Sequence, residues 1–333
     1  MSMRRIAKKI YNEQLGSVSM IAALFMAVLI GIAGFTLDKG VYYSEGSKLQ
    51  NSLDSAVLAA SMELPASSVH SSNWTLAENK AISYVSLNKF EITRDDLEPI
   101  YQNDNPLNQV IGIRATKTVT INYNFIKVLG INSGTVTRTS SAGLSPVGGV
   151  KGVVPLCISA SGLSSAIASG VIEGLIIKCS TDSALIGIDP HTASGWFGAV
   201  RIDGSGASQF STLLANGYSG ILTVGQVLDM ESGNMSGPTM DGFTTRVSRC
   251  TEGCTADSYL PDCPRLVYVP VIDVLPGKQV KIVAFAAFFL ESCGGSGNNS
   301  YIKATYMEGI SMSSSAAGKS GQDFGLYVNK LLD

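Results

Sequence analysis

The chain has 333 residues, of which 45% are hydrophobic and 15% charged, and its formal net charge at pH 7 is −2. This hydrophobic fraction supports packed cores and excludes a wholly disordered chain, and the near balance of charge argues against a nucleic-acid partner. The length suits about two domains. The charged fraction is well below the roughly 25% of soluble domains, which is typical of a secreted or surface protein.

The first strong feature is an uncharged apolar run over residues 16–37. As a helix this run would be about 33 Å long, which matches the roughly 30 Å hydrocarbon core of a bilayer. Residues 1–15 form a basic stub, so the positive-inside rule places the N-terminus in the cytoplasm and the rest of the chain outside. The run therefore predicts a single transmembrane helix with the lipid-facing anchor residues Met20, Leu24, Val28, Leu29 and Phe35.

Two alternatives apply to the same run. A cleaved secretory signal has an apolar core of about 7 to 15 residues and a small-x-small cleavage site. This run is longer, and its end carries the bulky residues Phe35 and Leu37 in place of small ones. A buried helix of a soluble protein is the second alternative, but apolar residues on every face of so long a helix favour a membrane span.

Beyond the anchor, residues 38–145 predict an α+β ectodomain. The helical spacing of apolar residues continues to Leu64, where Pro65 is expected to end the helix. One side of this extension is polar, so we expect it to pack on a globular body, and its small residues would let another helix approach closely. The candidates for helix docking are Leu49, Leu53, Ala56, Val57 and Ala60.

The remainder of this ectodomain predicts a second helix and a small antiparallel sheet. The helix is expected over residues 75–88, with an N-cap in Ser71–Asn73 and with Trp74, Ala77, Ile82 and Val85 facing inward. From residue 108 the pattern alternates with a period of two through Phe125, which predicts half-buried strands. Another strand is expected over 135–140, after a turn at residues 132–134.

A family resemblance rests on the order of these segments. A basic stub, an apolar run and then KLQNSLDSAVLAA over residues 48–60 resemble the TadE/TadG-like family of Flp (tight adherence) pilus-assembly proteins. The stretch 119–131 is similar to the family's strand and Leu-Gly-Ile turn, and Ser140–Ala142 to the small residues that end its next strand. The resemblance covers residues 10–145. It implies a non-enzymatic membrane protein whose partners are Flp-type pilins or Tad assembly-platform proteins.

The related pseudopilins are cut after a glycine and carry a glutamate five residues into the mature chain. Gly16 resembles such a cleavage site, but the fifth residue after it is Ile21 and the apolar run holds no acidic residue. This departure favours an uncleaved, TadG-like anchored protein over a polymerising pilin.

A linker over residues 145–149 precedes a mostly β outer domain over residues 150–317. Strands are expected near 171–177, 195–202 and 221–224, and three strong ones over 265–273, 279–290 and 301–311. Short helices are expected over 207–215, capped by Ser205, and over 238–248, with Pro238 at the first helical position. Residues 318–333 predict a Gly-rich peripheral tail with a short helix.

Six cysteines lie in this second half, and their even number predicts disulfides outside the cytoplasm. Three within one short segment also suit a zinc site, but neither histidine lies at a ligand spacing from them, so we expect no metal and no other cofactor. Sequence leaves the pairing open among the candidates Cys157, Cys179, Cys250, Cys254, Cys263 and Cys293.

Motifs for other chemistry are lacking in the sequence. Many TadG-like proteins carry a von Willebrand A-type domain with a metal-binding Asp-x-Ser-x-Ser, but the nearest stretch, Asp203–Ser208, lacks the final serine at its position. There is no Gly-x-Ser-x-Gly, His-Glu-x2-His or nucleotide-binding glycine pattern, and His191 follows Asp189-Pro190 as in a turn. We therefore expect that the protein has no enzymatic activity.

The sequence thus predicts an α+β protein in the cytoplasmic (inner) membrane, crossing it once, that serves Flp pilus assembly as an assembly factor, pilus anchor or minor pilin-like subunit. The alternative function is a surface adhesion module that binds a ligand and has no assembly role. Its candidate contact patch consists of the aromatic residues Trp196, Phe197, Tyr218 and Tyr259. Trp196 and Phe197 also suit the core of the outer domain.

Overall fold

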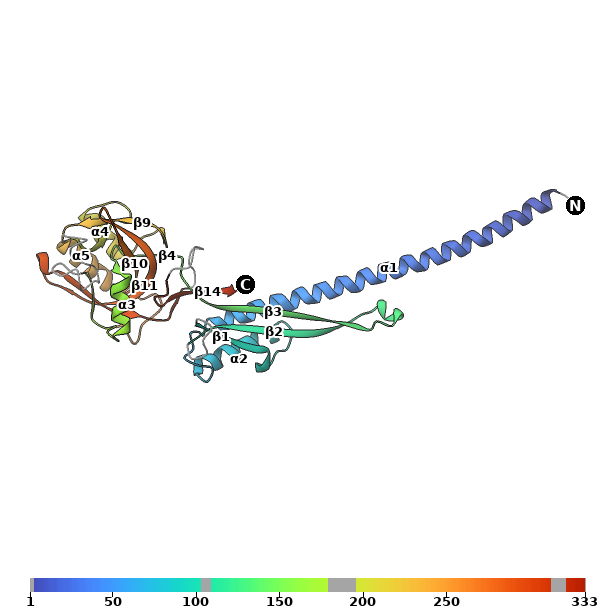
Figure 1. Cartoon of the computed structure of the whole chain (residues 1–333), viewed down its shortest axis with the longest axis horizontal. Helices are drawn as coiled ribbons and strands as arrows, with labels where there is room; N and C mark the ends of the chain where they lie inside the picture. Colours follow the sequence, from blue (N-terminus) through green and yellow to red (C-terminus); the bar gives the residue numbers. More distant parts are fainter. Residues whose placement is uncertain (1–2, 103–108, 179–195, 313–321, 333) are drawn as a thin grey trace. The chain divides into compact units, whose positions relative to one another are not determined.

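The computed structural model describes residues 3–102, 109–178, 196–312 and 322–332, with side chains from residue 19 onward. The chain divides into two compact units, the first of Met1–Gly143 with Leu331–Asp333 and the second of Leu144–Lys330. Helices and strands both contribute to each unit (Figure 1). The predicted α+β class is confirmed.

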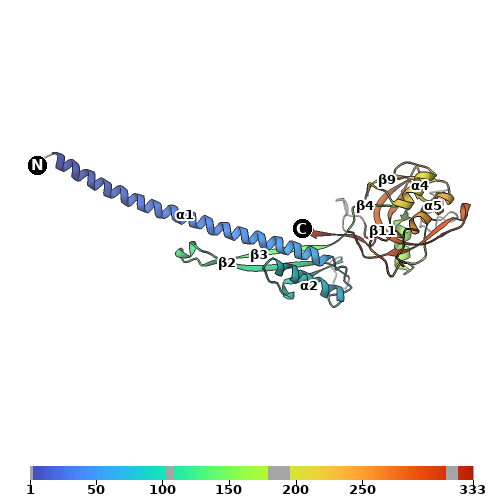
Figure 2. The same ribbon diagram turned by 180° about the vertical axis from the view of Figure 1, so that it is seen from behind.

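Unit 1 is organised on one long helix, α1 (Met3–Ser61), which runs through the apolar run and beyond it without a break. The prediction of one continuous helix is confirmed. It ends three residues before Leu64, because a following proline disfavours the helical conformation of the residue before it. The C-terminal part of α1 lies along the rest of unit 1, while its N-terminal part extends past it (Figures 1 and 2).

The second helix, α2 (Ser72–Leu87), packs against α1. Its start follows the predicted capping, because the Ser71 hydroxyl accepts a hydrogen bond from the Trp74 backbone N–H. The buried positions recur at intervals of three to four residues: Trp74, Ala77, Ala81 and Val85. Ile82, which we expected to face inward, is only half-buried, because Ala81 and not Ile82 continues that spacing.

The strands of unit 1 form an antiparallel meander. A 3-10 turn, η1 (Arg94–Asp96), leads into β1 (Leu97–Tyr101), which pairs with β2 (Val110–Asn122), and β2 pairs with β3 (Ser133–Pro146). The period-two prediction holds along β2, but it is wrong at its end. Phe125 is exposed, because the chain leaves the sheet there for the 3-10 turn η3 (Ile126–Leu129), which Gly130 closes with φ +85°.

Unit 2 contains a mixed sheet in the strand order β5-β10-β11-β12-β6, with β9 joining β11 to β7, and a separate pair, β4 with β8. The longer strands are those predicted. The bounds are β4 (Gly149–Lys151), β5 (Ile158–Ser159), β6 (Leu175–Lys178), β7 (Trp196–Val200), β8 (Ile221–Thr223), β9 (Val227–Ser232), β10 (Leu266–Leu275), β11 (Gln279–Gly294) and β12 (Tyr301–Met307).

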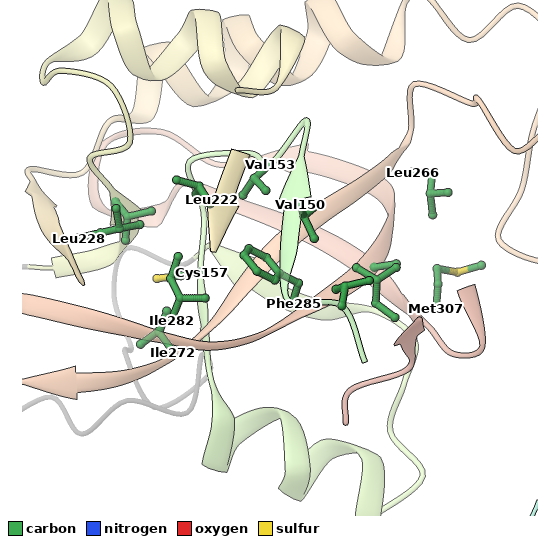
Figure 3. Close-up of a cluster of buried hydrophobic side chains, with 14 of the residues drawn as sticks. Val150, Val153, Cys157, Leu222, Leu228, Leu266, Ile272, Ile282, Phe285 and Met307 are labelled. Carbon is green, nitrogen blue, oxygen red and sulfur yellow. The ribbon is translucent and has the colours of Figure 1, made fainter. Parts of the chain in front are cut away.

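Strand β11 is the centre of this sheet, paired antiparallel with both β10 and β12. Its apolar run is buried on both faces, which explains why it lacks alternation. Phe285, Ala287 and Phe289 face one core, shown around Phe285 in Figure 3. Phe288 and its even-numbered neighbours face the other core, together with side chains of α3 (Ala160–Ala168), α4 (Ala207–Asn216) and α5 (Ser236–Val247).

Local details of unit 2 differ from the predictions. Helix α4 begins after Gly206 without a side-chain cap, so the expected cap by Ser205 is wrong. Helix α5 begins at Ser236, two residues before Pro238. A turn η5 (Gly297–Asn299) precedes β12, and β13 (Ile310–Met312) pairs in parallel with β14 (Leu326–Leu332). The tail therefore contains a strand where we expected a short helix, since Leu326 and Tyr327 are apolar enough to be buried.

Candidate membrane anchor and its contacts

The anchor residues share one property, which is that their large apolar side chains are exposed. The exposed fractions are 75% for Met20, 71% for Leu24, 54% for Val28, 55% for Leu29 and 46% for Phe35. Among the described helices, one is long and apolar enough to cross a membrane, and it covers Ser19–Ser61. A helix that exposes apolar side chains all around is unstable in water and suits a hydrocarbon environment.

The helix-docking candidates lie on the same helix but are buried inside the protein's own fold. All five have an exposed fraction of 0%: Leu49, Leu53, Ala56, Val57 and Ala60. They join α1 to α2 and β2, and the small side chains of Ala56 and Ala60 suit the close packing of α1 on α2. These residues thus hold α1 on the rest of unit 1. A partner protein has to contact other residues, such as Leu58, which is 38% exposed.

A carboxylate that no sequence pattern indicates joins α1 to the end of the β2–β3 hairpin. Asp38 is 2% exposed, and its carboxylate accepts three backbone N–H groups, from Asn124 at 2.8 Å, Phe125 at 2.9 Å and Ile126 at 2.7 Å. Burial works against its ionisation, but the three amides and nearby Lys127 outweigh burial and hold the pKa of Asp38 below its ordinary 3.8. The only signal was one acidic residue directly after the apolar run.

Next to this carboxylate, the hairpin touches α1 through a glycine. A Cβ on Gly34 would lie 2.7 Å from the Phe125 Cβ, so only glycine leaves room for this contact. An apolar groove of about 300 Å³ continues between α1 and the hairpin, with walls that include Ala27, Ile30, Gly31, Val128 and Leu129. The hairpin therefore lies against the second half of the apolar run.

A comparison with protein-family models finds a match that begins in the apolar run of α1. Residues 16–63 match the family model described as "Putative Flp pilus-assembly TadE/G-like". The matched segment is similar to that family. The match spans the apolar run, Asp38 and the buried docking residues, and it confirms the resemblance predicted for this part of the chain. Neither the curated proteins nor the solved structures gave a match.

Unit 2 brings three of the predicted cysteines together. The sulfur atoms of Cys250, Cys254 and Cys263 all lie within 4.8 Å of one another, and the Cys250 and Cys263 Sγ atoms are 3.7 Å apart. The group does not include Cys157, which is buried in a core, or Cys293, which is half-buried. Cys179 lies outside the described residues.

Two thiols of this cluster, Cys250 and Cys263, differ in acidity. Hydrogen bonds from the Cys254 and Glu252 backbone hold the pKa of Cys250 below its usual range, whereas burial raises the pKa of Cys263 to about 11. Within the described part of the chain, the three cysteines form the one group of three or more potential metal ligands, one fewer than a structural zinc site uses. These three thiols are free in the structure, and a disulfide between two of them is a prediction whose formation needs an oxidant that takes up two electrons.

We predict that Cys250 and Cys263 are joined by a disulfide in protein taken from its native compartment, because their sulfur atoms lie only 3.7 Å apart. Alkylation of free thiols before digestion, followed by peptide mass mapping, measures this directly. The linked peptide should persist in Cys254→Ser and disappear in Cys250→Ser. Six alkylated cysteines would contradict the prediction, and so would alkylation of all three cluster thiols only after a chelator is added.

Within the described ranges, the remaining candidate residues lie apart from one another or belong to structural contacts. The turn before α4 is held by Glu231, which accepts the Gly206 backbone N–H at 3.2 Å and pairs with Arg201 at 3.3 Å, and Asp203 belongs to no ligand group among the described residues. His70 is exposed, and His191 lies outside the described residues. Trp196 is 4% exposed in a core, so it does not belong to a surface aromatic patch.

Proposed function

We propose that this protein is a non-enzymatic component of Flp/Tad-type pilus assembly, anchored in the cytoplasmic membrane by α1. The N-terminal stub lies in the cytoplasm, and the chain from Asp38 onward lies on the outer side of the membrane. The single observation that carries the proposal is the TadE/G-like match over 16–63, which coincides with the one described helix of membrane-spanning length. The partners are a Flp-type pilin or a protein of the Tad assembly platform.

Two parts of α1 would have different roles in this function. The exposed apolar residues up to Leu37 face lipid, and the buried residues from Leu49 to Ala60 fix the folded body to the same helix. Because α1 is continuous between these two parts, a force on the body is transmitted to the anchor without a flexible joint. This stiffness suits a protein that holds a pilus or a pilus-assembly intermediate at the membrane surface.

The test compares sheared surface filaments with washed membranes by immunoblot, in the native host and in a strain that lacks the gene. We expect full-length protein in the membranes alone, and no filaments in the deletion strain. A copy that is shorter by about the first 16 residues and enriched in filaments would mean cleavage after Gly16 and a minor pilin. Filaments that persist in the deletion strain but no longer adhere would support the surface-adhesion alternative.

A further inference from the structure

The end of the β2–β3 hairpin, residues 125–131, exposes an unusual number of large apolar side chains; we call these residues the hairpin tip. Phe125 is 51% exposed, Val128 86%, Leu129 77% and Ile131 49%. Scattered exposed apolar residues are ordinary, but four within seven residues form a patch that water does not favour.

The hairpin tip lies at the level of the anchor along α1. The groove between them is lined on the helix side from Ala27 to Phe35, and Asp38 holds the base of the tip. From Asp38 back to Ala27 a helix rises about 16 Å, which is close to half of a roughly 30 Å hydrocarbon core. The residues that the tip faces therefore belong to the outer half of the predicted span.

Four backbone N–H groups of the hairpin tip have hydrogen-bond partners within the protein, which lowers the cost of placing the tip in hydrocarbon. The N–H groups of Phe125 and Ile126 donate to Asp38, the Val128 N–H donates to the Phe125 carbonyl at 3.2 Å, and the Gly130 N–H to the Lys127 carbonyl at 3.0 Å. Lys127 is the one charged residue of the tip, and a lysine stem is long enough to return its ammonium group to the membrane surface.

We propose that the hairpin tip enters the outer leaflet of the membrane beside α1, so that lipid acyl chains cover Val128, Leu129 and the groove. The inference rests on the proposed function, because it takes α1 to be a membrane anchor. Lipid is the occupant because the apolar surface of the tip continues directly into the exposed apolar surface of α1. The second contact with the bilayer would fix the depth and the rotation of the anchor, which one helix alone leaves free.

The test uses the full-length protein in phosphatidylcholine vesicles whose acyl chains carry bromine, which quenches nearby tryptophan fluorescence. Leu129→Trp and Leu87→Trp are a matched pair, because the two leucines are 77% and 76% exposed in the same unit, and Leu87 lies at the end of α2. The native Trp74 and Trp196 are each 4% exposed and supply a constant baseline. We expect quenching of the added tryptophan in Leu129→Trp alone.

Equal emission of Leu129→Trp in brominated and ordinary vesicles would overturn the inference, and Val128→Trp repeats the test one residue away. A shift to shorter wavelength without quenching would assign the tip to a protein contact and would also overturn it. Alkaline carbonate extraction separates this failure from failure of the proposed function. Protein that stays in the membrane pellet but is not quenched refutes only the tip, whereas protein released by carbonate refutes the anchor.

Discussion

Replacing Leu53 with alanine is expected to loosen the packing of α1 against the rest of unit 1 and to lower its stability by about 2–5 kcal/mol, the usual cost of such a cavity. Leu53 is 0% exposed and belongs to the surface that joins α1 to α2 and β2. Leu58→Ala is the matched control, because Leu58 lies one helical turn or so further along α1 and is 38% exposed. Its cost should stay below about 1 kcal/mol.

Hydrogen exchange of α2 amides in the full-length protein in detergent measures this difference, because α2 is held to α1 by the buried face. We expect exchange in Leu53→Ala to be about 30-fold faster or more, since 1.4 kcal/mol corresponds to a factor of ten. Exchange that is as slow as in the wild type would mean that α1 contributes little to the folding of unit 1. In that case the five buried residues would again be candidates for a surface that binds a partner protein.

The sequence predicted the elements of this fold well wherever one period dominates a segment. The apolar run and the three-to-four spacing after it predict α1, and the alternation in β2 predicts the meander. The continuous run from Phe285 to Leu290 predicts a central strand. These patterns are local, so neighbouring residues alone are enough to reveal them.

The candidate site depends instead on contacts between distant residues. Asp38 binds backbone groups of residues 86 to 88 positions away, and no local pattern reports such a contact. The turn at η3 looked like the continuation of a strand, because Phe125 continues the alternation of β2. Periodicity also revealed which residues of α1 are apolar, but not whether they face a partner or the protein's own core.

Replacing Asp38 with asparagine is expected to release the hairpin tip from α1. The carboxylate accepts three amides with two oxygens, whereas an asparagine offers one oxygen and turns an NH2 group toward the remaining donors. The N–H groups of residues 124–126 should then exchange at least about tenfold faster than in the wild type. Asp54→Asn is the control, because Asp54 bonds only to Gln50 of the same helix among the hydrogen bonds described, at 2.7 Å.

The same contact predicts a pH dependence with a definite sign. Because the pKa of Asp38 is lower in the folded protein than its ordinary value of 3.8, the stabilisation is complete above 3.8 and is lost as the pH falls through the lower folded value. The protection of residues 124–126 should therefore be constant near neutral pH and decline only in strong acid, and Asp38→Asn should remove this decline. Protection that is the same in both proteins at every pH would show that the groove and the Gly34 contact hold the tip without Asp38.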